Sequence, residues 1–250
     1  MKKVRVDRAL VDRGLCESRE KAKRLIMARA VRINGRAIEK ASDMVGEADD
    51  LSLVSEEKFV SRGGLKLEAA LDDFGIDVAG ARALDVGAST GGFTDCLLSR
   101  GAEEVVAVDV GHGQLAWKLR QNPRVKVMER QNARYLKPEL FGELFTPFDV
   151  VVVDCSFISL KLILPPLIPL ARIGGSLIPL IKPQFEAGKA EVDRGRGVIR
   201  DEEIRGRVVD EIREFVNTAT GLSWQEVLES PIEGPAGNRE YLAWIRRFET

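Results

Sequence analysis

The segment from residue 82 to residue 110 constrains the fold of this chain more than any other part of the sequence. A short apolar strand pattern, 82–88, runs directly into the turn Ser89-Thr90-Gly91-Gly92-Phe93, and a helical stretch follows. A second strand pattern, 104–110, ends near Asp109. Strand, glycine turn, helix, strand and terminal acid together form one nucleotide-binding βαβ unit. The sequence therefore predicts an α/β domain built on a parallel sheet.

The glycine turn distinguishes between two kinds of cofactor. Its pattern, Gly87-x-Ser89-x-Gly91-Gly92, lacks the usual second glycine of a dinucleotide-binding loop. Asp85 would repel a pyrophosphate but suits the cationic methionine end of S-adenosylmethionine. Asp109 follows about twenty residues later, where a carboxylate can accept both ribose hydroxyls. The loop favours S-adenosylmethionine over a nicotinamide cofactor, although Asp85 could instead cap a helix or tie a loop.

Further strand and helix patterns follow at the spacing of an α/β fold. Residues 201–216 have the apolar periodicity of a helix, and residues 224–228 and 241–246 are expected to pair antiparallel across a turn at 234–237. Buried-strand patterns cover 125–128, 148–154 and 175–181. These patterns predict a Rossmann-like class I methyltransferase domain with a mostly parallel seven-stranded sheet.

The net charge of −1 hides a strong asymmetry along the chain. Residues 1–40 hold thirteen Lys and Arg against five acids, which gives +8 and leaves −9 for the remainder. A basic segment joined to an acidic body is expected to meet a polyanion. A solvated helix face is the ordinary explanation for basic residues, but here they continue from helix to strand and turn.

The basic segment also has a recognisable order of elements. A short helix that ends near Gly14 precedes a helix capped by Ser18, a strand at 31–33, an Asn34-Gly35 hairpin turn and a strand at 51–54. This order resembles the RNA-binding domain first seen in a small-subunit ribosomal protein. We place this small α+β domain at residues 1–58 and the catalytic domain at 59–250, with a linker near 56–61. The expected RNA contacts are Arg5, Arg8, Arg19, Lys21, Lys23, Arg24, Arg29, Arg32 and Arg36.

Candidate catalytic residues stand at the predicted strand ends. Asp154 ends one strand and Lys182 ends the next, while Glu240 begins a final strand that runs the opposite way and so returns to the same edge. Lys66 lies in the first turn of a predicted helix, 65–74, where the pattern alone indicates a surface lysine. An acid and a lysine on adjacent strand ends could form a catalytic charge pair or a structural salt bridge, and the pattern does not choose between them.

Five motifs, in order along nearly the whole chain, resemble the TlyA (hemolysin A-like) family of FtsJ-type ribose 2'-O-methyltransferases. They are Ser61-Arg62-Gly63-Gly64-Leu65-Lys66-Leu67, the run 85–94, Asp154-Cys155-Ser156-Phe157-Ile158-Ser159, Ile181-Lys182-Pro183-Gln184-Phe185-Glu186 and the run 234–241. The resemblance implies a catalytic tetrad of Lys66, Asp154, Lys182 and Glu240. It implies ribosomal RNA or a ribosomal subunit as partner, cytidine as the methylated nucleoside, and no metal.

S-adenosylmethionine is the cofactor that both the glycine loop and the resemblance indicate. In the implied mechanism Lys182 deprotonates or orients a ribose 2'-hydroxyl, and the two acids hold the lysines. Asn132 is expected at the adenine edge. The full set of expected cofactor contacts is Asp85, Gly87, Ser89, Thr90, Gly91, Gly92, Phe93, Asp109, Asn132 and Asp154.

Other chemistries fit the sequence less well. Methylation of an exocyclic amine would want an Asn/Asp-Pro-Pro-aromatic motif, which residues 154–157 lack. Carbon methylation would want a nucleophilic cysteine, but Cys155 has no partner motif and is expected to be a small buried thiol. Phe93 and Trp117 are expected in the core rather than as stacking platforms. A catalytically silent ribosome-assembly factor is an alternative that the intact tetrad disfavours.

The family's other name suggests a membrane-active hemolysin. The N-terminus has no apolar signal core, and no stretch reaches the length of a membrane span. The three cysteines, Cys16, Cys96 and Cys155, form no Cys-x-x-Cys pair and indicate neither a disulfide framework nor a zinc site. We therefore expect a cytoplasmic protein with no membrane partner, and the sequence leaves the oligomeric state open.

Overall fold

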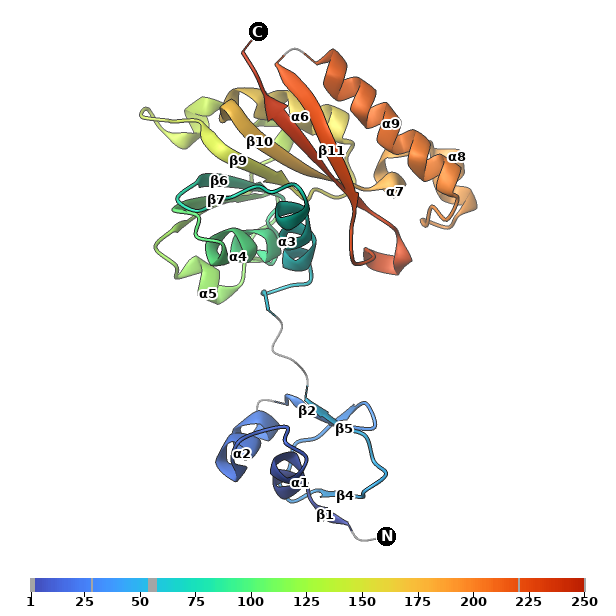
Figure 1. The fold of residues 1–250 in the computed structure, drawn as a ribbon. Helices are drawn as coiled ribbons and strands as arrows, with labels where there is room; N and C mark the ends of the chain where they lie inside the picture. The colour runs from blue at the N-terminus through green and yellow to red at the C-terminus, as the bar shows by residue number, and fades with distance from the viewer. Residues whose placement is uncertain (1–2, 28, 54–57, 220, 250) are drawn as a thin grey trace. The chain divides into compact units, whose positions relative to one another are not determined.

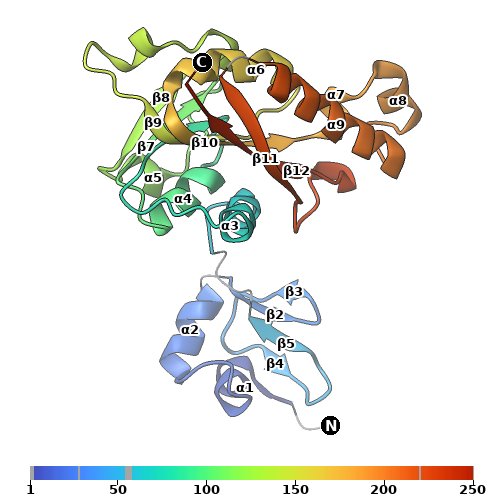
Figure 2. The same ribbon diagram turned by 45° about the horizontal axis from the view of Figure 1, so that its top comes forward.

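The computed structural model describes residues 3–27, 29–53, 58–219 and 221–249. The chain divides into two compact units, Met1–Lys58 and Phe59–Thr250, each of which is described by itself (Figures 1 and 2). Residues 54, 56 and 57, which the sequence assigns to the end of a strand and to the linker, lie outside the described residues.

The N-terminal unit packs two helices against short strands. Its core consists of apolar side chains from both helices and from the strands, among them Val6, Leu10, Ile26, Val31 and Val45. Strand β2 lies between β3 and β5, and β1 pairs with β4. The elements are β1 (Val4–Arg5), α1 (Val6–Asp12), α2 (Arg19–Met27), β2 (Val31–Ile33), β3 (Arg36–Ala37), β4 (Met44–Val45) and β5 (Leu51–Leu53).

Local sequence explains most of this small unit. The amide of Lys21 donates to Ser18 Oγ at 3.2 Å, so Ser18 caps α2 as the sequence predicts. Asn34 and Gly35 have φ of +51° and +78°, the paired left-handed conformation that a two-residue hairpin turn between β2 and β3 requires. Asp7 is buried and accepts hydrogen bonds from Arg5 and Arg19, which ties the start of α1 to the start of α2.

The C-terminal unit is built on a seven-stranded sheet with the order β11-β12-β10-β9-β6-β7-β8. Only β12 runs against its neighbours β10 and β11; the pairs among β10, β9, β6, β7 and β8 are parallel. The strands are β6 (Arg82–Val86), β7 (Glu104–Asp109), β8 (Val125–Glu129), β9 (Phe148–Val153), β10 (Ala171–Ile181), β11 (Leu222–Glu229) and β12 (Tyr241–Arg247). The predicted Rossmann-like fold and its closing antiparallel pair are confirmed.

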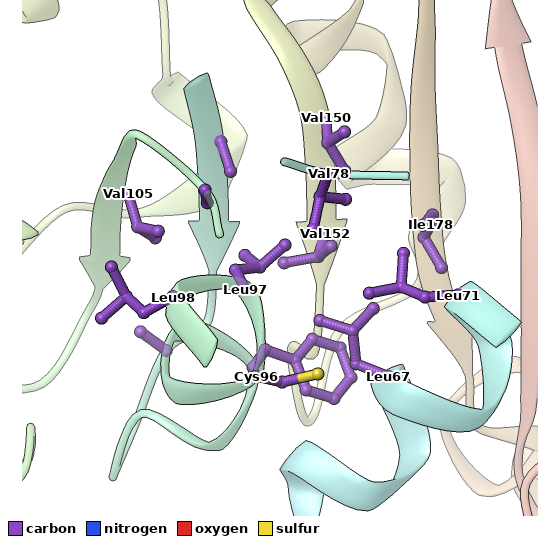
Figure 3. Close-up of a cluster of buried hydrophobic side chains, with 14 of the residues drawn as sticks. Leu67, Leu71, Val78, Cys96, Leu97, Leu98, Val105, Val150, Val152 and Ile178 are labelled. Atoms are coloured by element: carbon purple, nitrogen blue, oxygen red, sulfur yellow. The ribbon is translucent and has the colours of Figure 1, made fainter. Parts of the chain in front are cut away.

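Helices cover both faces of this sheet. They are α3 (Gly63–Asp73), α4 (Gly92–Ser99), α5 (Trp117–Arg120), α6 (Leu160–Leu167), α7 (Pro183–Glu186), α8 (Lys189–Arg194) and α9 (Glu202–Thr218), with short 3₁₀ turns at Ala133–Tyr135, Pro138–Phe141, Ile168–Leu170 and Pro235–Gly237. Helices α3 and α4 pack on one face, where Leu67 and Leu97 belong to the same apolar cluster as Val150 and Ile178 (Figure 3). Helices α6 and α9 cover the other face, with Ile163 and Ile212 among the buried side chains.

The strand order determines which loops meet at the carboxyl edge of the sheet. Strand β6 lies between β7 and β9. From β6 the chain first adds β7 and β8 on one side of it, and then crosses over to add β9 and β10 on the other side. Open α/β sheets bind ligands at this switch point, outside the carboxyl ends of the strands. Because β12 is antiparallel, Tyr241 pairs with Ile181, and the residue before β12 reaches the same edge as the residue after β10.

Two expectations about side chains and strand limits are wrong. Trp117, expected in the core, is 74% exposed on α5, whereas Phe93 is buried as expected. Strand β10 begins at Ala171 rather than Gly175, and its register with β9 shifts between Ala171 and Ser176. Within the part of the chain that the structure describes, no helix is both long and apolar enough to cross a membrane.

Candidate functional site

A cavity of about 850 Å³ opens at the carboxyl edge of the sheet, beside the switch point. Segments from five places in the sequence form its walls: the start of α3, the glycine loop after β6, the loop after β9, the segment that follows β10 and the segment that precedes β12. The lining residues include Lys66, Asp85, Gly87, Ser89, Thr90, Gly92, Phe93, Asp154, Lys182 and Glu240. All four residues of the expected tetrad therefore face one cavity, together with most of the glycine loop.

Two glycines are required by close approach of the backbone in this loop. Gly87 has φ of +86°, and a Cβ placed on it would lie 2.6 Å from the carbonyl oxygen of Asp154. A Cβ on Gly92 would lie 2.8 Å from the amide nitrogen of Gly64 and would also strike Ser61 Oγ. The first glycine lets the loops after β6 and β9 meet, and the second lets α3 and α4 begin side by side.

Asp85 is a buried carboxylate with one oxygen to spare. Its side chain is fully buried, and Oδ2 accepts a hydrogen bond from Thr94 Oγ1 at 2.6 Å. Oδ1 has no hydrogen-bond partner among the described residues, although Asp85 lines the cavity. Burial raises the pKa of Asp85 to about 7, against the hydrogen bond from Thr94 and with further repulsion from Asp154 and Asp109. A cation bound beside Oδ1 would fit this unpaired oxygen.

A second cavity of about 410 Å³ adjoins the first and holds Asp109 and Asn132, with Gly87, Ser89 and Asp154 common to both. Asp109 is the last residue of β7, and it accepts hydrogen bonds from the amides of Gly111 at 2.6 Å and Ser89 at 2.8 Å. Its carboxylate therefore holds the glycine loop as well as facing the cavity. The side chain of Asn132 accepts from the amide of Arg134 and leaves its amino group free to donate.

Lys182 and Asp154 form the first of two lysine–acid pairs. Lys182 Nζ lies 2.6 Å from Asp154 Oδ1 and donates to Ser156 Oγ at 2.9 Å. The lysine side chain is 8% exposed, and its ammonium also lies 5.8 Å from the centre of the Phe185 ring. These contacts fix the position of Nζ, which is the requirement for a group that acts on one atom of a substrate.

Lys66 and Glu240 form the second pair, across 174 residues of sequence. Lys66 Nζ donates to Glu240 Oε2, and Gln184 Nε2 donates to Glu240 Oε1 at 3.4 Å. The expectation from the pattern that Lys66 is a surface lysine is wrong, because Lys66 is 7% exposed and Glu240 is 1% exposed. The reason is tertiary: α3 starts at the sheet edge, so its first turn points into the cavity.

Gly91 does not line either cavity, although the sequence places it among the cofactor contacts. It has φ of +99° and lies at the N-terminal cap of α4. A Cβ on this residue would lie 2.7 Å from Leu115 Cδ1. Its glycine identity is thus explained by the turn into α4 and by packing.

Four residues that the sequence analysis did not single out also line the large cavity: Ser156, Phe157, Gln184 and Asn238. Phe157 is 89% exposed and has φ of +63°, which is rare for a bulky residue. Its ring contacts that of Phe185 at a tilt of 48°, with ring centres 4.9 Å apart. The signal was available, because all four residues stand inside the motifs that carry the family resemblance.

Cys155 is not suited to act as a nucleophile. Burial raises the pKa of its thiol to about 12, with a further contribution from the neighbouring Asp154. Its Sγ donates weakly to the carbonyl oxygen of Val86 at 3.6 Å. Cys155, expected to be a small buried thiol, is only partly buried in the structure.

The basic residues of the N-terminal unit lie at its surface, and many have local partners. The pairs are Arg5 and Arg19 with Asp7, Arg8 with Asp12, Lys21 with Glu17, and Arg29 with Glu39, while Arg32 donates to the carbonyl oxygen of Gly35. Lys23, Arg24 and Arg36 are exposed, and within the described residues no hydrogen bond or ion pair holds them. These three side chains are the most available for contact with a polyanion.

A mostly parallel seven-stranded sheet, with a glycine loop and an acid at its switch point, defines a Rossmann-like methyltransferase. The model of the FtsJ-like methyltransferases matches residues 59–247, and the model of the S4 domain matches residues 4–51. The chain belongs to the FtsJ-like methyltransferase family, in the TlyA group whose members resemble it over nearly the whole length. The family expected from the motifs is confirmed.

Curated relatives give the group its names. The 16S/23S rRNA (cytidine-2'-O)-methyltransferase TlyA of Mycobacterium tuberculosis is 49% identical over 98% of this chain and 90% of its own length. The protein named Hemolysin A of Brachyspira hyodysenteriae is 40% identical over 96% of this chain and 98% of its own length.

Solved structures agree with this placement. A Streptococcus thermophilus protein provisionally described as a hemolysin is 43% identical, covers all of this chain and 90% of its own, and superposes with a TM-score of 0.75. A methyltransferase of Listeria monocytogenes, described as dependent on S-adenosylmethionine, is 17% identical over 76% of this chain and all of its own, with a TM-score of 0.55, and it shares the fold. No group of three or more His, Cys, Asp and Glu among the described residues could hold a metal ion.

Proposed function

We propose that this protein transfers a methyl group from S-adenosylmethionine to the 2'-hydroxyl of a cytidine ribose in ribosomal RNA. The observation that carries the proposal is the convergence of Lys66, Asp154, Lys182 and Glu240 on the cavity that the glycine loop lines. The name of the Mycobacterium tuberculosis relative supports the substrate and the position of the methyl group. Such an enzyme would act where ribosomes are, in the cytoplasm.

The residues of both cavities fit S-adenosylmethionine. Asp85 Oδ1, buried and without a partner among the described residues, suits the ammonium of the methionine end. Asp109 and Asn132 line the adjoining cavity and would hold the ribose and the adenine edge. The cofactor supplies a methyl group on a sulfonium, which an oxygen nucleophile can accept in one displacement.

The chain's own contribution is to place the hydroxyl and manage its proton. Lys182 Nζ, fixed by Asp154 and Ser156, would bind the 2'-oxygen. As the neutral amine, after its own ammonium proton has been released to solvent, it would take up the hydroxyl proton as the oxygen attacks. The pair of Lys66 and Glu240 would form the opposite wall and keep the ribose oriented. Phe157, exposed at the mouth of both cavities, would limit the freedom of the nucleoside. Positioning of two bound reactants supplies most of the rate enhancement.

A test of this mechanism is the variant Lys182→Ala, assayed with tritiated S-adenosylmethionine on 16S and 23S ribosomal RNA transcribed in vitro. We expect methyl transfer to fall by about a thousandfold or more, because the group that handles the proton is lost. Cofactor affinity should stay within a few fold, and Lys126→Ala on β8 is the control for loss of one lysine. Activity of Lys182→Ala equal to that of Lys126→Ala would rule out the mechanism.

We also propose that the N-terminal unit supplies affinity for the RNA. Its net charge of +8 over residues 1–40 and the exposure of Lys23, Arg24 and Arg36 support this role. A membrane-active function, which the name of the Brachyspira hyodysenteriae relative suggests, is less favoured, because the tetrad has a clear use in methyl transfer. Mapping of 2'-O-methylated cytidines in ribosomal RNA incubated with and without this protein would identify the nucleotide that it methylates.

A further inference from the structure

A third cavity lies behind the loop that carries Asn238 and Glu240. It has a volume of about 360 Å³, and its charged lining consists of Arg200, Arg205 and Arg239 together with Glu202 and Glu233. Both glutamates are exposed, so they are free to turn toward solvent. Among the lining residues the arginines outnumber the acids, which favours an anion as the occupant.

Arg205 is the residue of this cavity whose buried charge has no acidic partner among the described residues. Its side chain stands on the first turn of α9 and is only 8% exposed. Nη1 donates to the carbonyl oxygens of Arg200 at 2.6 Å and Ile199 at 3.3 Å. Nε is buried without a hydrogen-bond partner, and across the described ranges no carboxylate forms an ion pair with this guanidinium.

A buried guanidinium without a counter-charge is costly, because the charge has lost its water and gained no anion in exchange. In folded proteins such a group is ordinarily paired with a carboxylate or a bound anion. The two carbonyl contacts orient the guanidinium but do not neutralise it. The described residues therefore supply no anion for this guanidinium, and a bound anionic ligand would supply the missing charge.

The surroundings of Arg205 favour a phosphate group. The guanidinium presents a planar fork of donors that matches two oxygens of a phosphate. The N-terminus of α9 adds nothing to this attraction, because the carboxylate of Asp201 already caps it by accepting from the amides of Glu203 and Ile204. Arg239, one residue before Glu240, is half-exposed and pairs with Glu229 at 2.8 Å, so it can exchange that surface partner for a phosphate.

Asn238 connects this cavity to the catalytic one. It lines the large cavity, donates from Nδ2 to the carbonyl oxygen of Gly197 at 3.0 Å and accepts at Oδ1 from the amide of Ile199 at 3.1 Å. Its two neighbours in sequence, Gly237 and Arg239, line the cavity of Arg205. One short loop thus separates the two cavities. An RNA strand with a nucleoside in the large cavity would cross that loop, and its next phosphates would lie at the cavity of Arg205.

We infer that the cavity of Arg205 binds a backbone phosphate of the RNA substrate, next to the nucleotide that is methylated. The identity of the substrate rests on the proposed function, whereas the need for an anion rests on Arg205 itself. The phosphate fixes the register of the strand and so determines which ribose enters the catalytic cavity. Phosphate contacts of this kind position a nucleic acid without reading its sequence.

The test measures binding of 23S and 16S ribosomal RNA, transcribed in vitro, to the full chain at several salt concentrations and without cofactor. Loss of one phosphate contact in Arg205→Gln should weaken binding about fivefold and reduce the slope of log affinity against log salt by about 0.7 to 0.9. Arg205→Lys keeps the charge but loses the fork, so it should recover the slope and only part of the affinity. Arg213→Gln, on the same helix and paired with Asp210, is the matched control.

A second variant guards against misfolding of Arg205→Gln. Arg200→Gln combined with Arg239→Gln removes two exposed charges of the same cavity and leaves Arg205 in place, and its salt slope should also fall below that of Arg213→Gln. Equal slopes for the cavity variants and the control would overturn the inference. In a separate arm, inorganic phosphate should raise the melting temperature of the wild type more than that of Arg205→Gln. A response to inorganic phosphate with unchanged RNA binding would indicate a small-anion site and would equally overturn the inference.

The two proposals can fail independently. Because the binding assay contains no cofactor, a protein without methyl transfer would still show the change in salt slope if Arg205 meets a phosphate. Conversely, full methyl transfer by Arg205→Gln with unchanged RNA affinity would leave the proposed function intact and remove the phosphate site.

Discussion

Two aspartates, one in each unit, are fully buried but have opposite surroundings. In the N-terminal unit Asp7 lies 3.0 Å from Arg5 Nε and 2.7 Å from Arg19 Nη2. The hydrogen bond from Arg5, with help from Arg19 and against the effect of burial, lowers the pKa of Asp7 to about 2. Among the described residues of the C-terminal unit no Lys or Arg forms an ion pair with Asp85, and burial raises its pKa to about 7.

The difference separates a structural carboxylate from a binding one. The N-terminal unit supplies both counter-charges of Asp7 from its own chain, so the residue holds α1 and α2 together and needs nothing else. Asp85 has a spare oxygen and no counter-charge among the described residues, so its partner has to arrive as a ligand. Burial alone does not reveal the role of a carboxylate; the presence or absence of a partner does.

The largest effect is expected from removal of the charge of Asp85. Asp85→Asn should weaken S-adenosylmethionine binding by about a hundredfold, because a charged hydrogen bond to the ligand ammonium is replaced by a neutral one. Isothermal titration calorimetry measures the change, with Asp73→Asn on the exposed face of α3 as the control. If Asp85→Asn binds the cofactor as well as Asp73→Asn does, Asp85 is a structural residue like Asp7.

The pH dependence of cofactor binding sharpens the same point. Below pH 7 Asp85 holds a proton that it must lose to pair with a cation, so affinity should rise about tenfold per pH unit up to about pH 7 and then level off. Asp85→Asn should lack this slope. In the cofactor-free protein, Asp85 binds a proton in the folded state between about pH 4 and 7 that it lacks when unfolded. Its contribution to stability is therefore present below about pH 4 and is lost as the pH rises to about 7.

Asp7 should show the opposite sign. Its lowered pKa contributes stability above about pH 4, and that contribution disappears as the pH falls toward about 2. Asp7→Asn should destabilise the N-terminal unit by about 1–2 kcal/mol, since two charged hydrogen bonds are weakened. Hydrogen exchange of α1 and α2 reports this loss, and cofactor affinity should not change. Protection of these helices equal to that of the wild type would mean that Arg5 and Arg19 do not stabilise the fold through Asp7.

The smallest effect is expected from the exposed basic residues of the N-terminal unit. Lys23→Gln combined with Arg24→Gln should weaken RNA binding about threefold to tenfold and lower the salt slope by about 1–2, because exposed charges each contribute little. Lys126→Gln combined with Arg213→Gln, in the other unit, is the control for the lost charge. A salt slope equal to that of the control would mean that this face of α2 does not meet RNA.

Local patterns were sufficient to predict the sheet and the glycine loop. Strand and helix periodicity identified β6, β7 and β9, and the departure from a dinucleotide loop drew attention to Asp85, which lines the large cavity. Asp109 was found because its distance along the chain from the glycines is fixed by one helix and one strand. In each of these cases the structural requirement is satisfied within about thirty neighbouring residues.

The partners across the site could not be predicted from local pattern. The expected direction of β12 placed Glu240 at the correct edge of the sheet. The pattern of α3, however, indicates a surface position for Lys66, so the pairing of Lys66 with Glu240 becomes visible only when α3 is packed on the sheet. The sequence pattern assigns Arg205 to an ordinary position on a helix. Nothing in the sequence shows that its guanidinium is buried without an acidic partner. Such properties arise from packing between distant segments, and a single sequence records them only through resemblance to a family.

The pairing of Lys66 with Glu240 has a consequence for synthesis of the chain. Lys66 is translated 174 residues before its acid, which is roughly ten to thirty seconds at ordinary rates of elongation. Until β12 has left the exit tunnel and entered the sheet, the nascent domain has a glycine loop but an unneutralised lysine in an incomplete catalytic cavity. On the proposed mechanism, a chain that terminates before residue 240 has no acid to pair with Lys66 and should be inactive in methyl transfer.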